Sequence, residues 1–103
     1  MLDFSRVQNY IVCGYTDMRK QIDGLAALVQ TQFGQEMDET SLYLICGRRA
    51  DRIKALYWAG TGYILLYKHL TEKRFQWPRS EKKLKKLTLQ EFCWLMEGCP
   101  LPR

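Results

Sequence analysis

The chain has 103 residues, and 47% of them are hydrophobic. A chain of this size forms one domain and can bury about 60–70% of the surface that its unfolded form exposes. The net charge of +5 favours an anionic partner, which is nucleic acid, an anionic membrane or an acidic protein. No apolar run approaches the ~20 residues of a membrane-spanning helix, so the sequence predicts no membrane segment.

Cysteine spacing excludes two kinds of site. Cys13, Cys46, Cys93 and Cys99 match neither a zinc ribbon nor a CxxC redox motif. The opening stretch "MLDFSRVQNYIV" has an early Asp and no long apolar segment of a signal peptide. We therefore expect reduced cysteines in a cytoplasmic protein, with no metal and no cofactor.

The first half of the chain predicts a strand and then a helix. The residues "QNYIVCGY" are β-branched and aromatic and read as a strand that ends near Gly14. Apolar residues recur at helical spacing through "TDMRKQIDGLAALVQTQF", with Thr16 or Asp17 as the N-cap and Gly34 as the stop. Gly24 inside this stretch costs ~1 kcal/mol relative to Ala, which predicts close packing of the helix at that point.

The second half predicts strands and a short final helix. "LYLIC", "RIKALYW" and "YILLYKHL" are strand-like and closely spaced, and a short "FQW" follows before Pro78. Short connections favour an antiparallel meander, with Gly60-Thr61 as a two-residue hairpin turn. Thr88 and Glu91 form a capping-box pattern at the start of the final helix.

These elements predict an α+β fold. We expect a small antiparallel β-meander with an N-terminal amphipathic helix and a short C-terminal helix packed on one face. The chain is a single domain, 1–103, with a core at 7–78, a basic connection at 79–87 and a C-terminal helix at 88–98.

Basic and aromatic residues surround the predicted hairpin. The stretch "GRRADRIKALYWAGTGYILLYKHL" places one aliphatic face on the core and leaves a second face that mixes rings with cations. Such a surface suits nucleic acid, because bases stack on rings and cations neutralise phosphates. Two other readings stay open: the charges only solvate the hairpin, or Lys54 lies over Tyr67 as a cation–π pair. The candidate nucleic-acid-binding residues are Arg48, Arg49, Arg52, Lys54, Lys68, Trp58 and Tyr67, with Lys82, Lys83, Lys85 and Lys86 as a secondary patch.

Catalytic patterns are weak. His69 is the single histidine, which excludes HExxH and paired-histidine nuclease designs. The acidic residues are scattered and mostly sit beside Arg or Lys, whereas two-metal strand transfer needs a carboxylate cluster. We therefore expect no enzyme activity and no catalytic residue.

Three blocks resemble one protein family. "GYTDMRKQIDGLAALVQ", the hairpin stretch with "RFQWP", and "LTLQEFCWLMEG" resemble, in that order and spacing, the small accessory protein TnpB of the insertion sequence 66 family. This family is unrelated to the RNA-guided nucleases that share its name. The resemblance covers about residues 7 to 98 and carries over no catalytic residue.

The resemblance implies a role in DNA transposition beside a separate, element-encoded transposase. We expect a non-catalytic accessory protein that binds DNA, at the element ends, through a basic and partly aromatic sheet surface. The alternative is a protein–protein adaptor or assembly factor that docks the transposase without touching DNA. Homo-oligomerisation is left open.

Overall fold

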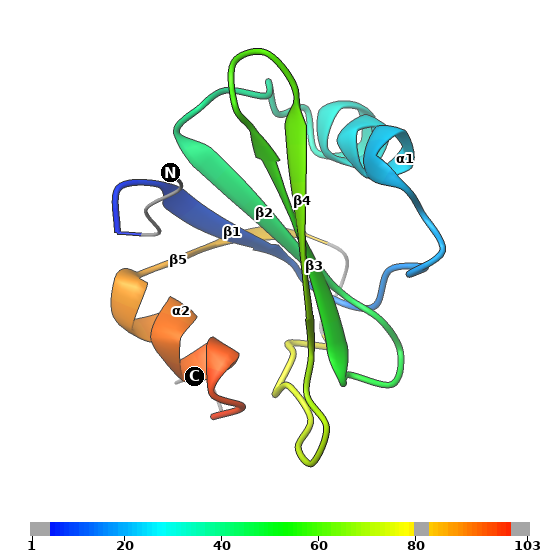
Figure 1. Ribbon diagram of the computed structural model, residues 1–103, viewed down its shortest axis with the longest axis vertical. Coiled ribbons are helices and arrows are strands. Elements are labelled where there is room, and N and C mark those ends of the chain that lie inside the picture. The colour runs from blue at the N-terminus through cyan, green and yellow to red at the C-terminus, as the bar shows by residue number, and fades with distance from the viewer. Residues whose placement is uncertain (1–4, 80–82, 100–103) are drawn as a thin grey trace.

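The computed structural model describes residues 5–79 and 83–99. Five strands form a single sheet in the order β4-β3-β2-β1-β5, with helical segments beside it (Figure 1). The elements are β1 (Gln8–Val12), α1 (Ile22–Ala27), the π-helix η1 (Leu28–Gln32), β2 (Ser41–Cys46), β3 (Arg52–Trp58), β4 (Tyr63–His69), β5 (Leu84–Leu87) and α2 (Leu89–Met96).

The predicted α+β class is confirmed, and so is the β2-β3-β4 meander. Ala59 donates its backbone N–H to the Gly62 carbonyl at 2.8 Å, and Trp58 pairs with Tyr63, as the two-residue turn requires. The sheet is mixed, however, and not purely antiparallel, because β1 pairs with β2 in parallel. A parallel pair needs a crossover of a dozen or more residues, and the segment that holds α1 and η1 supplies it.

The expectation that both helices pack on one face is wrong. Leu44 and Ile53 belong to a core cluster that includes Phe92 and Leu95 of α2. A second cluster, on the other face, joins Ile45 and Leu56 to Leu25 of α1. All residues of β2 are buried, which is the pattern of a central strand covered on both sides.

The first helix is shorter than its apolar stripe. It begins at Ile22 with Gln21 as N-cap, and residues 28–32 continue it with π-helical geometry. Neither predicted cap serves it: the Asp17 carboxylate accepts from the backbone N–H of Arg19, and Thr16 donates its backbone N–H to the carbonyl of Cys46. The stretch that follows β1 is thus hydrogen-bonded to the end of β2 before the helix begins. Gly34, at φ +63°, ends the helical segment as predicted.

Near the C-terminus, the capping box is confirmed. Thr88 Oγ1 accepts from the N–H of Glu91 at 3.1 Å, and Glu91 Oε1 accepts from the N–H of Thr88 at 3.0 Å. The stretch predicted as a basic connection differs, because its last residues form β5, which pairs antiparallel with β1.

The "FQW" segment forms no strand. Phe75 and Trp77 are buried in the cluster on the α2 face, and Trp77 donates its indole N–H to the Val12 carbonyl at 2.9 Å. The aromatic side chains of this segment therefore pack in the core, while the backbone of the segment is not part of the sheet.

Gly24 does not seat the helix tightly, contrary to the sequence prediction. A Cβ at this position would meet only the Lys20 side chain, at 3.6 Å, which is ordinary contact. Gly24→Ala should therefore raise the free energy of unfolding by up to ~1 kcal/mol through helix propensity. Chemical denaturation of the wild type and the variant measures this difference in the free energy of unfolding. Gly34→Ala is the matched control and should destabilise by ~1–2 kcal/mol because of its positive φ; a loss of stability in Gly24→Ala would restore the tight-packing hypothesis.

Candidate nucleic-acid interface

Strand direction brings several distant segments to one end of the sheet. The C-terminal ends of β1, β2 and β4 and the N-terminal ends of β3 and β5 all lie there. Backbone hydrogen bonds tie the segments together: Leu70 donates to the Asp51 carbonyl at 2.8 Å, and Cys13 donates to the Lys83 carbonyl at 2.9 Å. Residues 13–21, 47–52, 70–79 and 83 are therefore neighbours in space.

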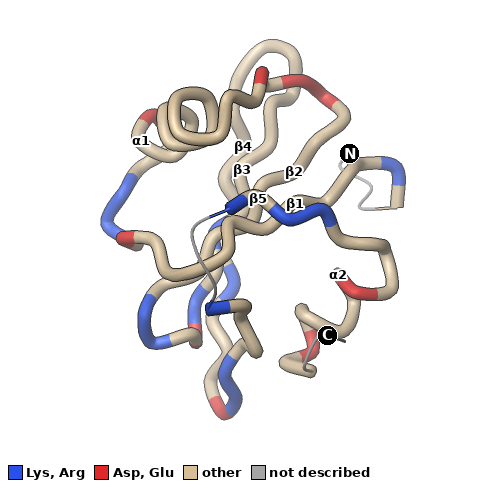
Figure 2. Tube along the Cα trace, turned by 180° about the vertical axis from the view of Figure 1, so that it is seen from behind, with Lys and Arg blue, Asp and Glu red and all other residues tan. Residues whose placement is uncertain are grey.

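Exposed cations gather at this end, which we call the basic end. Its exposed lysines and arginines are Arg19, Lys20, Arg48, Arg49, Arg52, Lys73, Arg74, Arg79 and Lys83. The acids in the same described segments are Asp17, Asp51 and Glu72. Figure 2 shows several blue segments in the lower part of the molecule and red segments in the loop at the top, with further blue on β5 and near the N-terminus and further red on α2 and in the bottom loop. That loop joins η1 to β2 and carries Glu36, Asp38 and Glu39.

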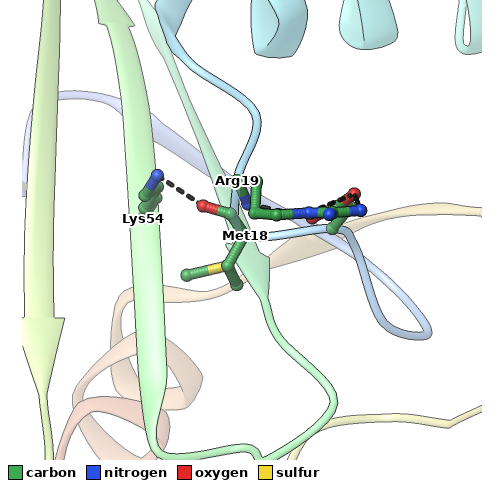
Figure 3. Close-up of polar contacts among 4 residues, drawn as sticks. Met18, Arg19 and Lys54 are labelled. Atoms are coloured by element: carbon green, nitrogen blue, oxygen red, sulfur yellow. Dashed lines mark hydrogen bonds and ion pairs between the residues drawn. The ribbon is translucent and has the colours of Figure 1, made fainter.

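The two acids nearest the arginines are already engaged. Asp17 receives hydrogen bonds from the Arg19 guanidinium, the shortest at 2.8 Å (Figure 3), and these bonds lower the pKa of its carboxyl. Asp51 lies between Arg52, at 3.9 Å, and the His69 ring nitrogen, at 3.5 Å. The acids therefore offset part of the positive charge and leave Arg48 and Arg49 uncompensated.

The predicted site residues do not form one surface. Arg48, Arg49 and Arg52 line a common hollow of about 380 Å³ at the basic end. Lys85 and Lys86 lie farther along β5, where alternation directs them to opposite faces of the sheet. Lys82 lies outside the described residues, and Lys83 belongs to the basic end.

The predicted aromatic residues are separated from the arginines. Trp58 lies at the far end of β3, about 20 Å along the strand from Arg52, where it packs edge-on against Tyr63 with ring centroids 4.9 Å apart. Tyr67 lies nearer the basic end and is 54% exposed on the edge strand β4. Lys68 donates to the Met96 carbonyl at 2.9 Å and so contacts the end of α2.

Lys54 has a structural role on the α1 face. Its ammonium donates to the carbonyl of Met18 at 2.7 Å and to that of Lys20 at 3.2 Å (Figure 3). These bonds hold the segment between β1 and α1 against β3. Lys54 as a DNA contact stays a prediction. Two of the three N–H donors of its ammonium are occupied, so it is not part of the basic end.

Sequence reasoning missed several members of the basic end. Arg19, Lys20, Lys73, Arg74 and Arg79 stand in three separate stretches, none of which is unusually basic on its own. These residues could have been found only by predicting that the first two strands pair in parallel. That pairing places the stretch after β1 beside "GRRADR".

The described part of the chain shows no metal-binding cluster, and the thiol of Cys46 is unreactive. Residues 5–79 and 83–99 contain no cluster of three or more His, Cys, Asp or Glu side chains that could hold an ion. Burial raises the pKa of the Cys46 thiol to about 12, so this thiol stays neutral.

Comparison with known proteins identifies the family. The family described as "IS66 Orf2 like protein" matches residues 7–103. The chain belongs to this family. Among curated proteins, it is 29% identical over 82 residues to the uncharacterized protein y4jC of Sinorhizobium fredii, covering 80% of this chain and 70% of that protein. No solved structure matches the chain.

Membership of the IS66 Orf2-like family ties the protein to transposition by insertion sequences of this type. The family match extends over the whole of the described sheet, so the basic end lies inside the part of the chain that the family covers. No helix among the described residues of this family member is long and apolar enough to cross a membrane.

The structural role of Lys54 can be tested. Lys54→Met keeps the length of the stem but removes two bonds from a charged donor, each of which contributes on the order of 1 kcal/mol. We expect a fall of ~1–2 kcal/mol in the free energy of unfolding. Arg52→Met is the matched control, because its ion pair is long and its side chain exposed, and should change stability by less than ~0.5 kcal/mol. Equal effects of the two substitutions in urea denaturation would contradict this role.

Proposed function

We propose that the protein is a non-catalytic accessory protein of transposition that binds DNA, at the element ends, through its basic end. One observation carries the proposal: cations from four separate segments converge on one end of the sheet, while an acidic loop occupies the other. A surface with an excess of positive charge attracts a polyanion and orients it during encounter.

The composition of the basic end supports a phosphate-binding role. It is rich in arginine, whose planar guanidinium can donate two parallel hydrogen bonds to a phosphate. Ion pairs between exposed side chains contribute little stability, so a cluster of exposed arginines gives the fold no evident benefit. Arg48 and Arg49 stand in the turn between β2 and β3, which lets neighbouring side chains spread over successive phosphates. Of the predicted secondary patch, Lys83 belongs to the basic end, and Lys85 and Lys86 could add contacts from opposite faces of β5.

A second candidate function is docking of the element's transposase, and a different surface favours it. A mostly apolar groove of about 260 Å³ lies beside β4 and is lined by Leu66, Phe92 and Met96 among others. β4 is the edge strand of the sheet, so its outer backbone groups have no strand partner among the described residues. Ile64, 40% exposed on the same strand, extends the apolar surface.

The DNA-binding proposal predicts a change in salt dependence. Arg48→Ala, Arg49→Ala and Arg52→Ala together should weaken binding to all DNA sequences. The slope of log affinity against log salt should become shallower by about 2–3 units, at ~0.9 per lost duplex phosphate contact. Gel-shift titrations at several salt concentrations, on element-end and random DNA, measure both quantities.

The matched control removes two charges that lie outside the basic end, farther along β5. Lys85→Ala and Lys86→Ala together should change the slope less, per charge removed, than the arginine triple does. An arginine triple that binds DNA with unchanged affinity and slope, but no longer retains transposase in a pull-down, would favour docking as the function.

Absence of catalysis is also a prediction. The purified protein should leave supercoiled plasmid intact in the presence of Mg²⁺ or Mn²⁺, because two-metal hydrolysis needs carboxylates that hold ions about 4 Å apart. Agarose gels of the plasmid give the readout. Nicking that disappears in Asp51→Ala would show that the protein is a nuclease.

A further inference from the structure

A hollow at the basic end lies between the segment that follows β1 and the turn between β2 and β3. It has a volume of about 380 Å³ and opens to solvent. Tyr15 and Met18 line it from the first segment, and Arg48, Arg49 and Arg52 line it from the turn. Pockets of ~300–1,000 Å³ typically hold small organic molecules, so this hollow has room for more than one phosphate group.

The arginines that line this pocket have too few acidic partners to neutralise them. Arg48 and Arg49 are exposed and make no ion pair or hydrogen bond with any residue in 5–79 or 83–99. Asp17 also lines the pocket, but Arg19 binds its carboxylate at 2.8 Å. Asp51 is shared between Arg52 and His69. The two free guanidinium groups therefore favour an anionic group at this wall.

The segment after β1 gives the pocket an aromatic and apolar lining. The guanidinium carbon of Arg79 lies over one face of the Tyr15 ring, 5.9 Å from the ring centroid, and adds a further cation beside the pocket. Met18 packs directly on Gly47, where a Cβ would come within 2.5 Å of Met18 Cγ. Gly47, which has no Cβ, thus lets the Met18 side chain pack directly against the turn.

The two walls together match the two ends of a nucleotide. Phosphate suits the arginines, and a base suits the ring and thioether, because stacking on an aromatic side chain tolerates any base. In a duplex, bases are stacked inside the helix and only their edges and the backbone face a protein. A pocket with both walls therefore fits a nucleotide that is not paired.

We propose that this pocket binds one unpaired nucleotide of a DNA strand, with its phosphate on Arg48 and Arg49 and its base against Tyr15. The inference rests on the proposed DNA-binding function and adds to it a preference for single-stranded or overhanging ends over blunt duplex. Such a preference suits a protein that acts where a duplex is opened or cut.

Three DNA probes of one sequence test the inference: a blunt duplex, the same duplex with a short single-stranded overhang, and the free single strand. Fluorescence anisotropy at one salt concentration gives their dissociation constants. We expect the overhang to bind about tenfold more tightly than the blunt duplex, as one added base–aromatic stack would produce. The wild-type comparison alone can refute the inference, whatever the variants do.

Variants then assign the two walls. Tyr15→Leu keeps an apolar side chain against the core and should remove most of the preference, while affinity for blunt duplex stays within about twofold. Tyr67→Leu, the matched control, alters an exposed tyrosine outside the pocket and should keep the preference. Arg48→Gln with Arg49→Gln should weaken binding to all three probes. Melting temperatures check that each variant is folded.

The outcomes separate this inference from the function on which it rests. Equal affinity for the three probes overturns the unpaired-nucleotide pocket and leaves DNA binding by the basic end intact. A preference that survives in Tyr15→Leu overturns the assignment of the base to this wall. Failure to bind any of the three probes overturns both proposals.

Discussion

Parallel pairing of β1 with β2 is the constraint on which the rest of the molecule depends. The pairing runs from Gln8 opposite Ser41 to Ile11 opposite Leu44, and the N–H of Thr16 extends it to the carbonyl of Cys46. Because the two strands point the same way, the chain leaves both at one end of the sheet. The antiparallel neighbours β3, β4 and β5 then bring the remaining basic segments to that end.

The same pairing produces a core on both faces of the sheet. A parallel crossover has to pass over one face, and here it carries α1 and η1, which leaves the other face for α2 and the buried Phe75 and Trp77. Lys54 shows the consequence for a single side chain. Lys54 lies on the α1 face of β3, where the crossover passes. Its ammonium therefore donates to backbone carbonyls of that segment, which leaves one N–H donor for other partners.

The two ends of the sheet differ in charge. The acidic loop before β2 lies at the hairpin end, where Glu39 approaches Gly60 and its carbonyl accepts from the Tyr57 hydroxyl at 2.7 Å. At the opposite end, Asp17 and Asp51 each already contact cations, which leaves Arg48 and Arg49 free in the described part of the chain. An anion approaching this molecule is therefore attracted more strongly to the basic end than to the end that carries the acidic loop.

Sequence alone determined the features that depend on near neighbours. Thr88 and Glu91 cap α2 because a capping box is closed by two bonds across three residues, and the Gly60-Thr61 turn fixes the register of β3 and β4 for the same local reason. The proximity of Arg48, Arg49 and Arg52 is also local, since two stand in one short turn and the third begins β3; their role as DNA contacts stays a prediction. Tertiary structure decided what depends on strand direction: the parallel β1–β2 pair, a helix on each face, the late start of α1, and the gathering of Arg19, Arg74 and Arg79 around the arginine turn. Alternation along a strand records which residues are buried but not which way the neighbouring strand runs, so the composition of the basic end could not be read from the order of residues.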